Sequence, residues 1–144
     1  MIYVCKLSPT FVGMKEIHTF YIGIGTNLSA AGMILRWTHR QLENTFQGKA
    51  RYSRPLQTRP IDFPNPATFT NQLVVFETPT PREQVETLLK DIERLAGRTT
   101  TDKGRGIVRL DLDLLMADGE VIRPKDWQRP YIRQAFEELN GQEI

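Results

Sequence analysis

The chain has 144 residues, of which 40% are apolar, and this length suits one domain with one hydrophobic core. Its formal net charge is +2, from 19 basic and 17 acidic residues, so it lacks the basic excess of a dedicated nucleic-acid-binding protein. A single cysteine, Cys5, excludes an internal disulfide, and no apolar run of about 20 residues could span a bilayer, so we expect a cytoplasmic protein without a membrane partner.

Residues 1–17 precede the clearest sequence pattern, and we interpret them as an N-terminal extension to a single domain over residues 18–144. They lack the basic flank and the uninterrupted apolar segment of an export signal. Two alternatives stay open for them: a short edge strand, or a biological start nearer to Met14.

Residues 18–25 predict a strand, because they are rich in aromatic and β-branched side chains and end in glycines. Gly23 and Gly25 do not form a dinucleotide-binding fingerprint, since Leu28 stands where the third glycine belongs, and we interpret them as turn and packing residues. A helix follows, with Ser29 as its expected N-cap. Its apolar stripe at helical spacing consists of Ala31, Ile34, Leu35, Leu42 and Phe46.

A second strand is expected over residues 50–54, and a long loop over residues 56–69. Long loops in compact domains are often functional, and the prolines here argue against free disorder. These prolines are Pro60, Pro64 and Pro66. Residues 69–77 then predict a third strand.

A second helix is predicted from the sequence Thr80-Pro81-Arg82-Glu83, which places threonine at the N-cap, proline at N1 and glutamate at N3 of a capping box. Gly97 is well placed to end this helix. Its expected buried residues are Val85, Leu88, Leu89, Ile92 and Ala96. The polar residues 98–106 predict a mobile segment, which is either a lid over bound phosphates or a solvated linker.

Residues 109–115 alternate with period two and predict a strand whose apolar face is made of Leu110, Leu112 and Leu114. Arg109, Asp111 and Asp113 share the opposite face, where the two carboxylates lie roughly 6–7 Å apart along the strand. Mg²⁺ is commonly held by one or two carboxylates and completed by substrate phosphates, so the pattern indicates a metal-phosphate site. The alternative is an ordinary solvent-facing strand in which Arg109 forms a surface ion pair with Asp111.

The remaining residues predict a turn at 117–120, a short strand at 121–122, an irregular stretch at 124–131 and a helical turn or two at 133–139. The order of elements is therefore βαββαβ, which is typical of an α+β, ferredoxin-like fold. We expect an antiparallel sheet with both helices on one face and the other face free for a ligand. An RNA-binding module of this fold is disfavoured, because its aromatic-rich strands and basic patch are missing.

Five stretches, in order and at similar spacing, resemble the 6-hydroxymethyl-7,8-dihydropterin pyrophosphokinase family over about residues 20–136. Residues 21–28 look like its opening strand and turn, and Thr58-Arg59-Pro60 looks like its Thr-Pro-Pro segment. Phe69-Thr70-Asn71 is similar to its aromatic-x-Asn pair. Gly97-Arg98 fits the end of its second helix, and the Leu-Asp-Leu-Asp sequence at 110–113 resembles its signature strand.

The resemblance implies a folate-pathway enzyme that transfers pyrophosphate from ATP to a pterin alcohol, with these two small molecules as partners and with a monomer or weak dimer as the working unit. Asp111 and Asp113 would hold two Mg²⁺ ions that bridge the triphosphate. Phe69 and Phe136 would flank the faces of the pterin ring. The implied pterin-binding residues are Thr58, Pro60, Ile61, Phe69, Asn71 and Phe136. The implied nucleotide-binding residues are Glu93, Arg98, Tyr131 and Arg133.

The departures from the family pattern fall on the nucleotide side. Val108 stands where an arginine usually precedes the first metal aspartate, so the expected catalytic cations are Arg98, Arg105 and Arg109. Tyr131 replaces a histidine that contacts ATP, and Asp126 stands near a position that is commonly basic. Two hypotheses stay open: an active Mg²⁺-dependent pyrophosphokinase with a rearranged phosphate loop, and a paralogue that binds a pterin or nucleotide without transfer.

Overall fold

The structure is a computed structural model that describes residues 16–59, 68–97 and 99–141. Its strands are β1 His18–Thr26, β2 Lys49–Tyr52, β3 Leu56–Thr58, β4 Phe69–Thr78, β5 Asp111–Ala117 and β6 Glu120–Val121. Its helices are α2 Ala31–Phe46, α3 Arg82–Leu95, α4 Thr100–Gly104, α5 Pro124–Trp127 and α6 Pro130–Gly141. Most of the predicted N-terminal extension lies outside the described residues.

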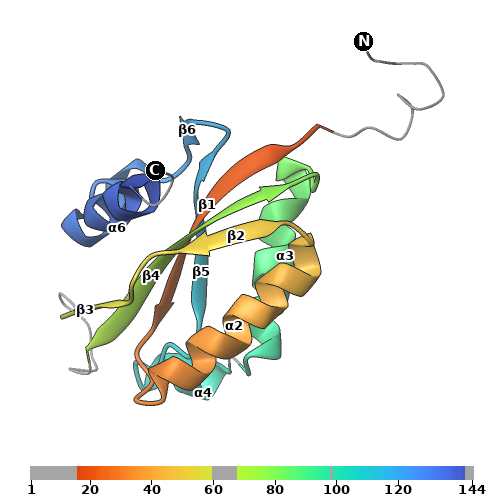
Figure 1. Cartoon of the computed structure of the whole chain (residues 1–144). Helices are drawn as coiled ribbons and strands as arrows, with labels where there is room; N and C mark the ends of the chain where they lie inside the picture. Colours follow the sequence, from red (N-terminus) through yellow and green to blue (C-terminus); the bar gives the residue numbers. More distant parts are fainter. Residues whose placement is uncertain (1–15, 60–67, 98, 142–144) are drawn as a thin grey trace, which may run out of the picture.

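The six strands form one antiparallel sheet in the order β2-β4-β1-β5-β6, and β3 pairs with the other end of β4 (Figure 1). The long strands β1 and β4 pair along nine residues, from His18 opposite Thr78 to Thr26 opposite Thr70. This arrangement confirms the predicted α+β, ferredoxin-like class. It also places the strand of the two aspartates directly beside β1, near the centre of the sheet.

Helices α2 and α3 lie on one side of the sheet and bury the main hydrophobic core against it (Figure 1). The apolar faces predicted for the two helices are largely buried in this core. Burying one such side chain contributes about 1.5–3 kcal/mol to the stability of the fold. The buried apolar residues of these helices are Leu35, Leu42 and Phe46 from α2, and Val85, Leu89 and Ile92 from α3. Leu110, Leu112 and Leu114 meet them from the sheet, which confirms their predicted common face.

The opposite face of the sheet is not wholly free, because α6 covers part of it. A second buried cluster joins sheet residues to the C-terminal helices. Its members are Tyr21, Leu73, Val75, Leu115, Trp127, Ile132, Ala135 and Leu139. The expectation of an irregular stretch at 124–131 is therefore wrong over α5, and α6 begins at Pro130 and is longer than the helical turn or two predicted at 133–139.

A bulge in β5 changes which of its last side chains face each layer. Tyr21 pairs with Met116 and Ile22 with Leu114, so Leu115 is an extra residue in the ladder. Leu115 lies on the α6 side, on the same face as Asp111 and Asp113, as the alternation directs. The bulge then reverses the alternation, so that Met116 also packs on the α6 side and Ala117 returns to the main core. Asp111 and Asp113 precede the bulge and stay on the face opposite the main core.

Both predicted helix N-caps are wrong. Helix α2 starts after Ala30, without a side-chain cap from Ser29, and α3 starts after Pro81. Thr80 instead donates its backbone N–H to the hydroxyl of Thr78 at 3.2 Å, which closes the turn out of β4. The predicted end of α3 is confirmed, because Gly97 has a φ of +96° and donates its N–H to the carbonyl of Arg94.

Two predicted loops contain regular structure. Residues 56–58 form β3, which pairs with the start of β4 and places Thr58 opposite Phe69. Residues 100–104 form the short helix α4, whose N-cap hydroxyl, on Thr99, accepts the N–H of Asp102. Elements of three and five residues are too short to show a hydrophobic period in the sequence. They are stabilised instead by strand pairing and by helix capping, which depend on other residues.

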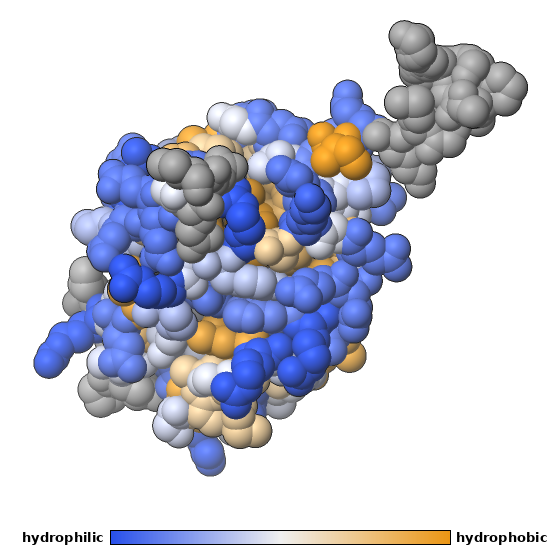
Figure 2. All heavy atoms as spheres, in the orientation of Figure 1, coloured by the Kyte–Doolittle hydropathy of each residue, from blue (hydrophilic) through white to orange (hydrophobic). Residues whose placement is uncertain are grey.

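The exposed surface gives no sign of a large apolar area on the side shown in Figure 2, where hydrophilic residues predominate. The large exposed hydrophobic residues of the described chain are separate from one another in the fold: Ile17 before β1, Met33 in α2 and Leu95 in α3. None of the described helices is both long enough and apolar enough to cross a membrane.

Candidate functional site

The register of the three central strands brings the chemically distinctive residues together. Gly25 of β1 pairs with Asn71 on one side and with Asp111 on the other. Two residues earlier, Gly23 lies between Leu73 and Asp113 in the same way. Since neighbouring strands are about 4.8 Å apart, Asn71 and Asp111 face one ligand-sized space across Gly25, which has no side chain to fill it.

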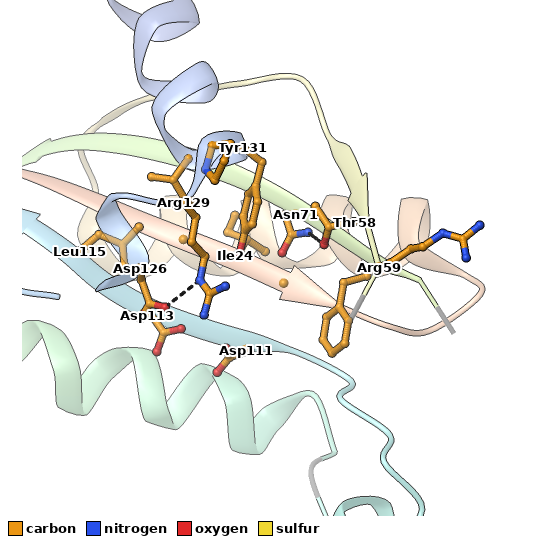
Figure 3. A pocket seen from close by; sticks show the side chains of 15 residues that line it. Ile24, Thr58, Arg59, Asn71, Asp111, Asp113, Leu115, Asp126, Arg129 and Tyr131 are labelled. Carbon is orange, nitrogen blue, oxygen red and sulfur yellow. Dashed lines mark hydrogen bonds and ion pairs between the residues drawn. The ribbon is translucent and has the colours of Figure 1, made fainter. Parts of the chain in front are cut away.

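A cavity of about 490 Å³ occupies this space, between the open part of the sheet and the start of α6 (Figure 3). The sheet contributes Gly23, Ile24, Gly25, Thr58, Arg59, Phe69, Asn71, Asp111, Asp113 and Leu115 to its lining. The C-terminal segment contributes Asp126, Arg129, Pro130, Tyr131 and Ile132. Its volume is in the range of small-molecule binding sites.

The two glycines form the floor of the cavity, so their interpretation as turn residues is wrong, whereas the close approach of Leu115 to Gly23 agrees with a packing role for that glycine. Both lie within β1, where a Cβ atom on Gly25 would meet only the side-chain oxygen of Asn71, at 3.5 Å. A Cβ atom on Gly23 would lie 3.2 Å from Leu115 Cδ1. The absence of both side chains lets a ligand approach the backbone of the sheet.

One end of the cavity carries polar and aromatic groups suited to a flat heterocycle. Asn71 Nδ2 donates a hydrogen bond to the hydroxyl of Thr58 at 2.7 Å, and this bond holds the amide in place (Figure 3). Phe69 lines the same end, opposite Thr58 in the ladder. Of the other predicted pterin-binding residues, Pro60 and Ile61 lie outside the described residues.

The other end carries Asp111 and Asp113, and their environment disfavours two charges. Burial, the neighbouring carboxylate of Asp113 and the charge of Glu93 together raise the pKa of Asp111 to about 7. Lys90 opposes this shift. A pair of carboxylates in this state is suited to a hard divalent cation, which replaces the shared proton. In the described chain no third His, Cys, Asp or Glu joins them in a metal-binding group, so a cation held here would need further oxygen ligands from phosphate or water.

Glu93 of α3 binds the backbone of β5 from the main-core side of the sheet. Its side chain is 1% exposed, and its Oε2 accepts the backbone N–H of Leu112 at 2.7 Å. The ammonium group of Lys90 lies 3.3 Å from Oε1. Glu93 was expected to bind nucleotide, but it does not line the cavity, and it acts in this structure on the backbone between Asp111 and Asp113.

We predict that Glu93→Ala lowers the free energy of unfolding by about 1–3 kcal/mol, because the buried N–H of Leu112 loses its acceptor. Glu93→Gln keeps an oxygen acceptor of the same size and is expected to cost less. Urea unfolding measures both variants, with Glu83→Ala on the exposed first turn of the same helix as control. Equal losses for the alanine and glutamine variants would contradict a hydrogen-bonding role.

We also predict that Mg²⁺ stabilises the protein more at about pH 8 than at about pH 5. An unfolded aspartate has a pKa near 3.9, whereas the pKa of Asp111 in the folded protein is about 7. The folded state therefore binds this proton more tightly, and the metal-free protein loses stability from this group as the pH rises from about 4 to about 7. Mg²⁺ needs the ionised carboxylate, so its stabilising effect must grow over the same range.

Thermal unfolding with and without Mg²⁺ over this pH range tests the prediction. The increase in Tm caused by Mg²⁺ should rise with pH in the unsubstituted protein and vary much less in Asp111→Asn. The same Mg²⁺ effect at both ends of the range would show that Asp111 does not take part. Asp102 and Asp118 do not interfere, because hydrogen bonds lower both pKa values and move their titration to more acidic pH.

Of the expected catalytic arginines, the two that the structure describes, Arg105 and Arg109, do not line the cavity. Arg109 binds Asp102 of α4 with two hydrogen bonds, at 2.6 and 3.2 Å, so the alternative of a surface ion pair between Arg109 and Asp111 is wrong. This pairing lowers the pKa of Asp102 and ties α4 to the start of the aspartate strand. Arg105 is exposed at the C-cap of α4, and Arg98 lies outside the described residues.

The C-terminal predictions divide between the cavity and the second core. Tyr131 lines the cavity, and burial raises the pKa of its hydroxyl, which stays protonated as a hydrogen-bond donor. Phe136, expected to flank the pterin, instead packs against Tyr21 and Trp127, with ring centroids 5.2 and 4.9 Å away. Arg133 lies over the Trp127 and Phe136 rings, so it too is outside the cavity lining.

Three charged residues of the cavity were not predicted as site residues: Arg59, Asp126 and Arg129. Asp126 and Arg129 fell in a stretch expected to be irregular, and Arg59 was used only to recognise a motif. Arg59 and Arg129 share one signal, which is their position at an element boundary: Arg59 follows β3 and Arg129 precedes α6. This signal could not identify them from the sequence, because β3 and the start of α6 were not predicted.

Comparison with known proteins agrees with this geometry. A family model described as 7,8-dihydro-6-hydroxymethylpterin-pyrophosphokinase (HPPK) matches residues 21–141. Two similar relatives, from two strains of Porphyromonas gingivalis, are both named 2-amino-4-hydroxy-6-hydroxymethyldihydropteridine pyrophosphokinase. Each is 24% identical over 131 residues, covering 83% of this chain and 88% of the relative. The family match includes both ends of the cavity.

Proposed function

Because the chain belongs to the 7,8-dihydro-6-hydroxymethylpterin-pyrophosphokinase family, we propose that it transfers pyrophosphate from ATP to 6-hydroxymethyl-7,8-dihydropterin and releases AMP. Family membership supports a pyrophosphokinase role in folate biosynthesis. The observation that carries the specific proposal is that Asn71, Gly25 and Asp111 lie side by side on three neighbouring strands. This places an amide that can bind a heterocycle and a pair of carboxylates in the lining of one cavity. We further propose that the protein acts as a cytoplasmic monomer or weak dimer.

The pterin is proposed to lie over Gly25 at the Asn71 end of the cavity. The amide of Asn71 is held by Thr58, so its oxygen is available as an acceptor for the N–H groups on the pterin edge. Phe69 contributes an aromatic face for the flat ring. Pro60 and Ile61, which follow Thr58 in the chain, are proposed to complete this pocket.

The triphosphate is proposed to lie at the Asp111 end, with Asp111 and Asp113 holding two Mg²⁺ ions. When bound, Mg²⁺ would neutralise negative charge on the phosphates. The fit is supported by the raised pKa of Asp111, whose causes include the neighbouring carboxylate of Asp113. Glu93 keeps the two ligands in register by binding the backbone N–H between them.

In the proposed reaction, the hydroxymethyl oxygen of the pterin forms a bond to the β-phosphorus of ATP, and the bond from that phosphorus to the oxygen of the α-phosphate breaks. AMP leaves with the electron pair, and the hydroxyl proton passes to solvent. We assign no side chain as general base, because phosphoryl transfer depends chiefly on positioning and charge stabilisation. The chain contributes the alignment of the two ends of the cavity.

The test is AMP formation from ATP and Mg²⁺, with and without 6-hydroxymethyl-7,8-dihydropterin. Pterin-dependent AMP together with the pterin diphosphate supports the proposal. The competing function is a paralogue that binds a pterin or nucleotide without transfer, and it is favoured by Val108 and by the engagement of Arg109 with Asp102. Pterin binding by calorimetry with no AMP above the pterin-free rate supports that alternative.

A further inference from the structure

We propose that Arg129 binds the phosphates of the anionic ligand at the Asp111–Asp113 end of the cavity. This inference rests on the proposed function, because it assumes that a Mg²⁺-bound polyphosphate occupies this end. It assigns a role to a residue that the sequence did not identify as part of the site.

Arg129 is placed at this end by the junction of the two C-terminal helices. It lies between α5 and α6, immediately before Pro130, and it lines the same cavity as Asp111 and Asp113. Figure 3 shows its side chain extending from the start of α6 into the cavity, toward the side of the two aspartates. A guanidinium group in this position can approach phosphate oxygens that are held over the carboxylate pair.

The present partner of Arg129 is easily exchanged. Its Nε lies 3.1 Å from Asp126 Oδ1, and the two side chains are 49% and 36% exposed. Such exposed pairs contribute little to stability. A phosphate offers the planar guanidinium two parallel charge-assisted hydrogen bonds, which are stronger than this single contact. Asp126 therefore holds Arg129 beside the cavity without competing strongly with a phosphate.

Other arginines of the described chain are less suited to this role. Arg109 is engaged by Asp102, and Arg105 does not line the cavity. Arg123 lies 3.9 Å from Asp113 but also 4.0 Å from Glu86, and it does not line the cavity either. Arg59 does line it, but it follows Thr58 at the opposite, Asn71 end.

The experiment measures binding of Mg²⁺ with a non-transferable ATP analogue, and separately of the pterin, to Arg129→Ala and Arg129→Lys. Loss of charge-assisted hydrogen bonds predicts that Arg129→Ala weakens nucleotide binding by roughly 10- to 100-fold. Arg129→Lys should recover part of this loss, because it keeps the charge and loses the bidentate geometry. Pterin binding should change little in either variant.

Arg94→Ala is the matched control, because Arg94 also pairs with an aspartate three residues away, Asp91, on an exposed helix surface outside the cavity. Nucleotide affinity in Arg129→Ala equal to that of the unsubstituted protein overturns the proposal, as does a complete lack of nucleotide binding by the unsubstituted protein. Arg129-dependent nucleotide binding without AMP formation supports the role of Arg129 and contradicts the proposed transfer. AMP formation that is insensitive to Arg129→Ala supports the transfer and contradicts this role.

Discussion

Asp111→Asn is expected to reduce pterin-dependent AMP formation by roughly 10³-fold or more, equivalent to about 4 kcal/mol of transition-state stabilisation. Asparagine has the same shape as aspartate but lacks the charge that would hold Mg²⁺ beside the phosphates. Since Asp113 shares the same strand face and the same cavity, Asp113→Asn should have a similar effect. The measurement is the steady-state rate with saturating pterin and Mg²⁺.

The fold should survive Asp111→Asn. A loss of activity would then report the loss of a metal-binding carboxylate and not unfolding of the protein. Burial and the charge of Asp113 already raise the pKa of Asp111 to about 7, so the metal-free protein accommodates a neutral group at this position. Asp111→Asn should therefore be at least as stable as the unsubstituted protein at about pH 8 in the absence of Mg²⁺. Asp91→Asn, on the exposed surface of α3, makes the same change outside the cavity and should keep full activity. A normal rate in Asp111→Asn would remove the carboxylate pair from the mechanism.

The aspartate strand could be predicted from sequence because its signal is local. The alternation in residues 110–114 fixes which side chains share a face, whatever the strand pairs with. The pairing partners are not local. That Asp111 faces Asn71 across Gly25 follows from the register of three strands, which short motifs do not specify. The carboxylate pair could therefore be predicted from the sequence, and the place of Gly23 and Gly25 in the cavity floor could not.

The C-terminal helix shows a different limit. Ile132, Ala135 and Leu139 have helical spacing, but polar residues separate them and the preceding prolines suggest irregular structure. Their helix is stabilised by packing on Tyr21, Leu73 and Leu115, which belong to three different strands. The positions of Tyr131 and Arg129 in the cavity, and of Phe136 outside it, depend on that packing, so the sequence could not specify them.

The arginines on the nucleotide side were misplaced for a related reason. Arg109 was expected near the phosphates because it adjoins the aspartate strand, but its guanidinium binds Asp102. Asp102 is in position only because α4 forms, with Thr99 as its N-cap. A five-residue helix has too little periodicity to be predicted, and its ion pair could not be predicted without it.

Gly25→Val, in the floor of the cavity, is expected to weaken pterin binding by about 10- to 100-fold. The Cβ atom itself fits, because its nearest neighbour would be the Asn71 side-chain oxygen at 3.5 Å. The two further methyl groups of valine project into the space where the ring is proposed to lie, and forcing extra methyl groups against a packed group costs about 1–3 kcal/mol. Calorimetric titration with the pterin measures the loss.

A stability measurement distinguishes a steric clash of valine with the pterin from damage to the fold. Gly25 has no positive φ, and a β-branched residue is favoured in a central strand, so Gly25→Val should unfold at the same or a higher temperature than the unsubstituted protein. Gly25→Ala, which adds only the Cβ atom, should lie between the two in pterin affinity. Gly32→Val on the exposed surface of α2 tests glycine replacement outside the cavity and should bind the pterin normally. A stable Gly25→Val protein with unchanged affinity would mean that the ring lies away from β1. In that case Asn71 and Asp111 would not act on the two ends of one substrate complex.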